Sequence, residues 1–182
     1  TGYPAGGGCG SLQLDYWDKV LNICQASYTI LRTWTIHDMC TGNTGSHTQI
    51  IKVLDKTPPV MTPPDQHDIH VGATNKIGYQ DCTAEVRLPW IQNTDDCSTT
   101  NNITFYAWTI LPDGTVSIVS VLNAQGEFVF NLPVLPKGQT YTFVYTAIDD
   151  CGNKSELSIA VEVSDFVPPV VICETIHTVA LT

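Results

Sequence analysis

The sequence is poor in basic residues and has no long apolar run. Eight Lys and Arg stand against 18 Asp and Glu, which gives a formal net charge of -10. A chain with this balance repels phosphate backbones and anionic membrane surfaces, so we expect no nucleic-acid binding. No stretch approaches the ~18 consecutive apolar residues of a membrane-spanning helix, so we expect no membrane insertion. The charge instead favours a cation, Ca²⁺ above all, as a small partner.

The sequence also lacks the short motifs that position catalytic groups. It contains no GxSxG, HExxH or P-loop pattern and no glycine-rich dinucleotide fingerprint. The stretch AGGGCG at 5–10 resembles a phosphate loop in glycine content only, because it has no lysine and no helical pattern after it. We therefore expect that the protein is not an enzyme.

Seven cysteines are present, at positions 9, 24, 40, 82, 97, 151 and 173. None form a CxxC pair, and none lie at the spacing of a zinc site. In an acidic chain rich in Thr, Val and Ile, disulfides are the better interpretation, and they indicate an oxidising, extracellular location. Because the number is odd, one cysteine is expected to stay free or to pair with a neighbouring module or chain.

One segment occurs twice. WTIHDMCTGNTGSHTQIIKVLDKTPPV at 34–60 corresponds to YTAIDDCGNKSELSIAVEVSDFVPPVV at 145–171. Each copy contains an alternating apolar run, an Asp-x-Cys turn with Gly and Asn, a second alternating run and a Pro-Pro linker. The alternation predicts an antiparallel hairpin, and proline ends the pairing because it has no N–H to donate.

Between the two Pro-Pro linkers lies one complete module, residues 57–165. Short apolar runs, turn signals and the Pro112-Asp113-Gly114 hairpin turn predict about seven antiparallel strands. We therefore predict an all-β fold of immunoglobulin-like Greek-key sandwiches in tandem. Residues 1–56 are expected to form a smaller module of this kind that lacks its first strand. Residues 166–182 are expected to supply the opening strand of a next module and to complete a copy of 1–56 in a neighbouring unit.

Three arrangements fit this division of the sequence. The chain is one period of a continuous tandem array, or a fragment with ragged ends, or a subunit that donates its C-terminal strand to a neighbour. All three predict copies of the protein assembled head to tail in a line.

The repeated hairpin resembles the closing signature of hyalin-repeat-like and immunoglobulin-like modules in large Bacteroidota cell-surface adhesins, including gliding-motility adhesins. The resemblance rests on residues 33–40, on residues 149–153 and on the loop LPWIQNTDDCS at 88–98. The first copy departs from the pattern by inserting Thr41, and the second has Tyr145 where Trp is usual. The resemblance implies an exported structural or adhesive module of an extracellular filament or surface stalk. The alternative is a lectin-like, carbohydrate-binding module.

The sandwich suggests how the cysteines pair. The loop after its second strand and the loop of its closing hairpin lie at the same end, so we expect a Cys97–Cys151 disulfide. Cys9–Cys40 is the expected counterpart in the small module, with Cys9–Cys24 as an alternative. Spacing does not fix the connectivity. The cysteines without an assigned partner are Cys24, Cys82 and Cys173.

Acidic turn residues predict a cation site. Asp95, Asp96, Asp149 and Asp150 are expected to converge at one pole of the sandwich, near Asp55 in the linker. Oxygen ligands gathered at a module junction suit Ca²⁺, which would stiffen the junction. In the alternative interpretation these aspartates only hydrogen-bond to the backbone of their own turns.

The tryptophans fall into two groups. Trp34, Trp90 and Trp108 lie in predicted strands and are expected to fill the sandwich cores. Trp17 lies beside Tyr16 between acidic residues, in a segment with a less regular pattern. This pair is a candidate contact for surface polysaccharide or for a neighbouring filament, and the alternative is a lid over the small module's core.

Overall fold

The computed structural model describes residues 2, 11–66, 69–73, 83–99, 102–136 and 138–164. Within these ranges the chain forms β-strands and no α-helix, and the strands pair antiparallel in several sheets. The predicted all-β class is confirmed. The expected opening strand at 166–182 lies outside the described residues, as do three of the cysteines, Cys9, Cys82 and Cys173.

The N-terminal part is a three-stranded meander in the order β1-β2-β3. Its strands are β1 (Leu12–Cys24), β2 (Ser27–Asp38) and β3 (Thr44–Val53). Among the described residues of this sheet only Trp34 and Ser27 are buried. The second layer that a sandwich requires is thus not among the described residues of 1–56. The segment around Trp17, which the sequence pattern made less regular, is a regular strand of 13 residues.

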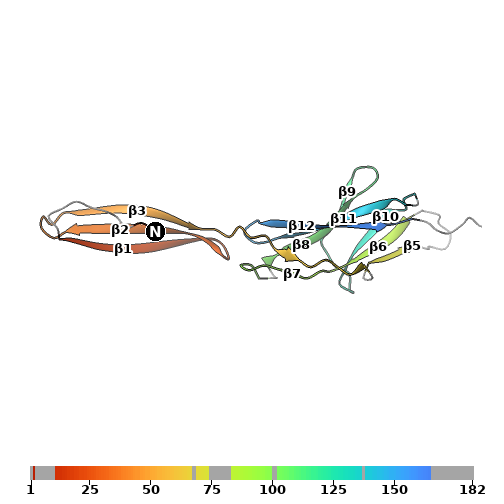
Figure 1. Cartoon of the computed structure of the whole chain (residues 1–182), viewed down its shortest axis with the longest axis horizontal. Helices are drawn as coiled ribbons and strands as arrows, with labels where there is room; N and C mark the ends of the chain where they lie inside the picture. Colours follow the sequence, from red (N-terminus) through yellow and green to blue (C-terminus); the bar gives the residue numbers. More distant parts are fainter. Residues whose placement is uncertain are drawn as a thin grey trace, which may run out of the picture.

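The remaining strands are β4 (Val60–Met61), β5 (His70–Ala73), β6 (Thr83–Pro89), β7 (Asn93–Thr94), β8 (Thr104–Ile110), β9 (Val116–Val119), β10 (Glu127–Pro133), β11 (Thr140–Ile148) and β12 (Lys154–Glu162). They form a sheet β10-β6-β5, a sheet β12-β11-β8-β9 and a small pair β4-β7. The two larger sheets face each other across one hydrophobic core, to which strands of both contribute. The first sheet and this sandwich lie end to end along the long axis of the molecule (Figure 1).

The sandwich core is aromatic. Phe128 and Phe130 of β10 alternate inward and meet Phe143 and Tyr145 of β11, all nearly inaccessible to solvent. The rings of Phe130 and Phe143 pack edge to face with their centroids 5.1 Å apart. The Tyr145 hydroxyl donates a hydrogen bond to the carbonyl oxygen of Pro89 at 2.9 Å, and burial raises the pKa of Tyr145. Buried side chains of this size each contribute about 1.5–3 kcal/mol to folding.

The structure places none of these tryptophans in the sandwich core: Trp34 is buried, but it lies on the first sheet and outside the core cluster. Trp90 follows β6 in a loop and is 42% exposed, and it contacts Phe105 at its edge. Trp108 is partly buried on the outer face of its sheet, where its ring nitrogen donates to Thr146 at 3.1 Å. Its position follows from alternation, because Ala107 before it points into the core.

The two copies of the repeated segment form the same hairpin turn. In each, the aspartate N–H donates to the carbonyl of the closing asparagine, Asp38 to Asn43 at 2.8 Å and Asp149 to Asn153 at 3.1 Å. In each, the aspartate carboxylate also accepts the N–H of the cysteine two positions on, at 2.9 Å. The glycine of each turn has a positive φ, 73° and 88°, which glycine adopts without steric cost. The internal repeat is therefore a repeat of structure, and the inserted Thr41 leaves these contacts in place.

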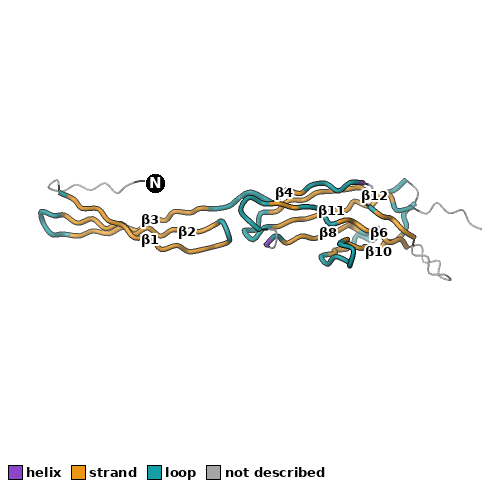
Figure 2. Tube along the Cα trace, turned by 90° about the horizontal axis from the view of Figure 1, so that it is seen from below, coloured by secondary structure: helices purple, strands orange, loops and turns teal. Residues whose placement is uncertain are grey.

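The correspondence extends beyond the hairpins. Strand β2 lies between β1 and β3, as β11 lies between β8 and β12. Figure 2 shows the first sheet as a single layer that continues away from the sandwich. The N-terminal sheet thus matches one layer of the sandwich. In the part of the chain that the structure describes, no helix has the length and apolar character to cross a membrane.

Candidate functional site

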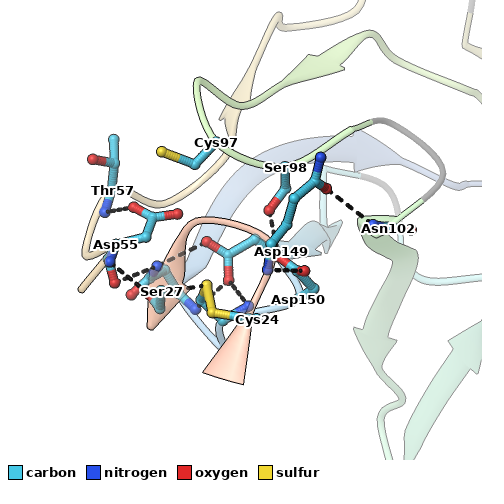
Figure 3. The surroundings of a disulfide bond; sticks show 12 residues. Cys24, Ser27, Asp55, Thr57, Cys97, Ser98, Asn102, Asp149 and Asp150 are labelled. Atoms are coloured by element: carbon cyan, nitrogen blue, oxygen red, sulfur yellow. Dashed lines mark hydrogen bonds between the residues drawn. A yellow bond between two sulfur atoms is a disulfide. The ribbon is translucent and has the colours of Figure 1, made fainter. Parts of the chain in front are cut away.

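The candidate site is the junction between the N-terminal sheet and the sandwich (Figure 3). The turn between β1 and β2 meets two sandwich loops there, 95–99 after β7 and 149–153 between β11 and β12. The Cys24–Cys151 disulfide joins the two parts covalently, with a Cα–Cα distance of 5.3 Å and a sequence separation of 127. Both sides of the junction are therefore fixed by short turns that contact each other directly.

The cysteine pairing differs from the expectation. Cys151 is bonded to Cys24, while Cys97 is a free, partly exposed thiol. The expected Cys97–Cys151 disulfide and the alternative Cys9–Cys24 are therefore wrong. The physical reason is that Cys24, at the end of β1, lies within bonding distance of Cys151, whereas the 95–99 loop contacts the closing turn of the sandwich through the hydrogen bond from Ser98 to Asp150.

Two cysteines need separate mention. Cys40 is also disulfide-bonded, and its partner lies outside the described residues. The expected Cys9–Cys40 pair involves a residue that is not described, so it stays a prediction. The thiol of Cys97 has a raised pKa, first because of its desolvation and then because of the nearby carboxylates of Asp55, Asp96 and Asp95.

Asp150 and Gln25 connect the loops by hydrogen bonds. The Asp150 carboxylate accepts the Ser98 hydroxyl at 2.6 Å and the Gln25 N–H at 2.8 Å. These two donors, the Ser98 hydroxyl first, hold the pKa of Asp150 below its usual value. The Gln25 side-chain oxygen accepts in turn from the Asn102 amide at 3.0 Å and from the Thr99 N–H at 3.3 Å. The β1–β2 turn is thus bonded to both sandwich loops.

The linker that follows β3 is held at the same place. The Asp55 N–H donates to the hydroxyl of Ser27 at 2.7 Å, and Ser27 is itself buried. The Asn153 side chain donates to the Asp55 carbonyl oxygen at 3.3 Å. One Asp55 carboxylate oxygen accepts the Thr57 N–H at 2.9 Å. The linker therefore has bonds to the first sheet and to the sandwich, which restrict its bending.

Three carboxylates converge beside these bonds. Asp55, Asp95 and Asp149 each offer an oxygen atom, and these atoms lie within 4.8 Å of one another. Asp149 is only 5% exposed. The Oδ2 atoms of Asp55 and of Asp95 are buried and accept no hydrogen bond. A buried carboxylate oxygen without a partner is costly, and negative charges this close repel each other. A bound cation would remove both costs.

The predicted cation site is therefore partly assembled. The structure brings Asp95 and Asp149 together, with the linker residue Asp55 as the third member of the group. Asp96 instead lies near Asp55 and Cys97 in a second group. Asp150 is directed to Ser98 and Gln25 and does not join the three carboxylates.

The donor set of this cluster suits Ca²⁺. Calcium takes six to eight oxygen ligands at about 2.3–2.6 Å, and carboxylates are its commonest protein ligands. The three carboxylates would provide the charge, and backbone carbonyls and water would fill the remaining positions. The sequence signal for Asp95 and Asp149 was a pair of adjacent aspartates in each of two loops, Asp95-Asp96 and Asp149-Asp150. Asp55 carries no such signal beyond its place before a Pro-Pro linker.

The aromatic pair proposed from the sequence does not form one surface. Tyr16 lies opposite Trp34 on one face of the sheet, with ring centroids 5.2 Å apart. Trp17 lies opposite Thr33 and points to the other face, where it is 58% exposed. The guanidinium of Arg32 stacks 4.2 Å from the Tyr16 ring centroid and forms two hydrogen bonds to Asp18. Tyr16 is thus part of a packed group, and only Trp17 is a free-standing aromatic contact.

No model of a known protein family matches the sequence, and a search of curated proteins returned no match. The resemblance to adhesin repeats therefore stays a prediction.

Proposed function

We propose that this protein is a structural or adhesive module of an extracellular bacterial filament or surface stalk, in which copies are joined head to tail. The observation that carries this proposal is the junction, where a disulfide and hydrogen bonds fix the first sheet as an axial extension of the sandwich. A binding domain does not need a rigid connection of this kind between its parts, whereas a unit that transmits tension along a line does. The disulfide also favours an extracellular location.

The immunoglobulin-like topology is part of this proposal. The order β10-β6-β5 facing β12-β11-β8-β9 requires the chain to cross between sheets after β6, after β9 and after β10, which fits a Greek-key connection. Tyr141 at the start of β11 donates its hydroxyl to the carbonyl of Pro133 at 2.8 Å. This contact resembles the tyrosine corner of immunoglobulin-like sandwiches. Modules of this kind in series form a quasi-one-dimensional rod.

We also infer that Ca²⁺ binds at the junction through Asp55, Asp95 and Asp149. The inference is supported by the two buried carboxylate oxygens that accept no hydrogen bond. Because Asp55 belongs to the linker and the other two belong to sandwich loops, a bound ion would add a further tie across the junction. The charge of the three carboxylates would then stabilise the junction instead of opposing it.

The experiment that tests the function is electron microscopy of the purified chain over a range of concentrations. We expect straight strings whose length increases in steps of one unit. Compact particles that never associate, together with binding to a polysaccharide array, would instead favour the second candidate.

That second candidate is a carbohydrate-binding surface module. The observations in its favour are the exposed rings of Trp17 and of Trp90, since sugars stack on aromatic faces. Trp90 borders a shallow hollow that is also lined by Pro63, Asp65 and Gln92. Replacing Trp90 and Trp17 by Ala one at a time would identify which ring, if either, contacts the glycan.

A further inference from the structure

Strand β9 is an edge strand of the sandwich. It follows β8 through a hairpin turn in which the Leu111 N–H donates to the carbonyl oxygen of Thr115 at 2.8 Å, and it pairs with β8 from Val116 to Val119. In the part of the chain that the structure describes, no strand pairs with its other edge. Figure 1 shows a hairpin at β9 that projects from the side of the sandwich, away from the long axis. An open edge of this kind is a template for a further strand.

The hairpin turn determines which backbone groups of β9 face the open edge. In an antiparallel ladder, residue pairs that exchange hydrogen bonds alternate with pairs that do not. Because Thr115 is bonded to Leu111, Ser117 is the next residue of β9 that bonds to β8. Val116 and Ile118 alternate with these residues, so their N–H and C=O groups point to the open edge. Two such edges supply each other with donors and acceptors when they run antiparallel.

The side chains beside this edge are apolar. The ladder places four of them on the outer face of the sheet, because opposite residues point to the same side. They are Trp108 with its opposite residue Ile118, and Ile110 with its opposite residue Val116. Ile118 is 61% exposed, and Ile110 and Val116 are each 55% exposed. Contiguous exposed apolar side chains of this size mark a contact site on a folded protein.

The open edge also carries no charge. Between Asp96 and Glu127 the sequence contains a single charged residue, Asp113 in the hairpin turn. The edge strands β1, β3, β10 and β12 each contain at least one Lys, Asp or Glu, whereas β9 contains none. Charged side chains on an edge strand hinder its pairing with another chain. Strand β9 therefore lacks the protection that these other edges have.

The distribution of charge favours a second copy of the chain as the partner. Each copy has a net charge of -10, so two copies repel each other over most of their surfaces. At β9 this repulsion is weakest, because Asp113 is the one carboxylate in the hairpin. A basic partner, which an acidic protein otherwise attracts, would find little to bind there. Identical antiparallel edges are in addition self-complementary about a twofold axis, which is the commonest symmetry of protein dimers.

We propose that β9 of one copy pairs antiparallel with β9 of a second copy, so that the two four-stranded sheets join edge to edge. Val116 and Ile118 would provide the backbone hydrogen bonds across the twofold axis. The apolar outer faces of the two sheets would then meet beside the joint. This contact is lateral and closes at two copies, so it goes beyond the proposed head-to-tail assembly and would hold two strings side by side.

The test combines sedimentation velocity with hydrogen exchange of the full chain over a range of concentrations. Ile118→Lys places a charge at the open edge, and the exposure of Ile118 leaves the core untouched. Ser158→Lys is the matched control, because it changes the net charge equally at an exposed position of β12, the opposite edge strand of the same sheet. We expect the wild type and Ser158→Lys to pair with the same Kd, and Ile118→Lys to raise the Kd at least about tenfold.

Hydrogen exchange identifies the strand that makes the contact. The N–H groups of Val116 and Ile118 face water in a single copy and are hydrogen-bonded in the pair, so exchange of the β9 peptide should slow as the concentration rises. Ser158→Lys should keep this dependence on concentration, and Ile118→Lys should remove it. Urea unfolding of both variants checks that the fold is retained.

The other outcomes overturn the proposal in distinguishable ways. If Ile118→Lys pairs as tightly as the wild type, another surface makes the contact. If β9 exchanges slowly at every concentration, a segment of the same chain occupies the edge. If the wild type stays single and β9 exchanges fast throughout, the edge does not bind its own copies. Straight strings that form without lateral pairs would overturn this inference and leave the proposed function in place.

Discussion

The β2–β3 and β11–β12 hairpins have the same sequence signature and the same turn, yet in the part of the chain that the structure describes only β11–β12 lies in a two-layered core. In β11 the inward residues are aromatic and inaccessible, and Phe143 is an example. The corresponding residue of β2 is Arg32, which pairs with Asp18 and stacks on Tyr16. The comparison teaches that the local sequence specifies the hairpin, whereas burial depends on which strands are available to cover it.

The largest effect on stability is expected from a substitution in the packed core of the sandwich. Tyr145→Ala should lower the free energy of unfolding by about 3–5 kcal/mol, because it leaves a cavity in the packed core and removes the bond to Pro89. Trp34→Ala, the matched change in the β2–β3 hairpin, should cost less, because Trp34 does not belong to the packed core of the sandwich. Urea unfolding of both variants measures the difference. Equal losses would contradict the comparison.

The next largest effect concerns the bond that unites the two regions. Replacing Cys24 and Cys151 by Ser should lower stability by about 2–4 kcal/mol, because the disulfide restricts the unfolded chain. Hydrogen exchange should then show the first sheet opening separately from the sandwich. Cys97→Ser removes a free thiol and should change neither stability nor exchange.

A smaller effect is expected from calcium. At a concentration about 100 times its Kd, Ca²⁺ should raise the stability of the folded chain by about 2.7 kcal/mol, and a chelator should reverse this. Asp95→Asn should abolish the response. Asp38→Asn is the control, because Asp38 accepts the N–H of a cysteine in the same kind of turn but lies outside the three-carboxylate group. A calcium response that survives Asp95→Asn would exclude this site.

The smallest effect is a dependence on pH at the junction. The pKa of Asp150 is lowered from 3.8 in the folded protein, first by the Ser98 hydroxyl and then by the Gln25 N–H. Its contribution to stability is therefore fully present above pH 3.8 and is lost as the pH falls through the lower folded value. Thermal unfolding between pH 5 and about pH 2 should show a steeper decline for the wild type than for Asp150→Asn. Parallel curves would mean that Asp150 does not stabilise the junction.

Much of the fold could be predicted because its signals are local. Alternating residues give β11 and β12, and the Asp-x-Cys pattern with glycine gives both turns. The acidic pole could also be anticipated, because Asp95 and Asp149 occupy loops at the same end of the sandwich.

The remaining features depend on contacts that local sequence does not encode. The Cys24–Cys151 bond forms between two parts of the chain that the sequence division kept separate. The face of the sheet on which Trp108 lies depends on which alternate residues of β8 point inward. A run in which neighbouring residues are all apolar does not determine this. Likewise, Tyr16 and Trp17 are neighbours in sequence and for that reason lie on opposite faces of β1.

The Cys24–Cys151 bond also determines the path of a pulling force. Tension that enters through β1 crosses from Cys24 to Cys151 and leaves through β12, so the residues between the two cysteines form a covalent loop that carries no load. The separation of 127 residues corresponds to about 420–460 Å of extended chain. In an oxidising medium that length stays out of reach of the force even when the sandwich unfolds. Reduction of one bond would convert an almost inextensible link into a long, compliant one.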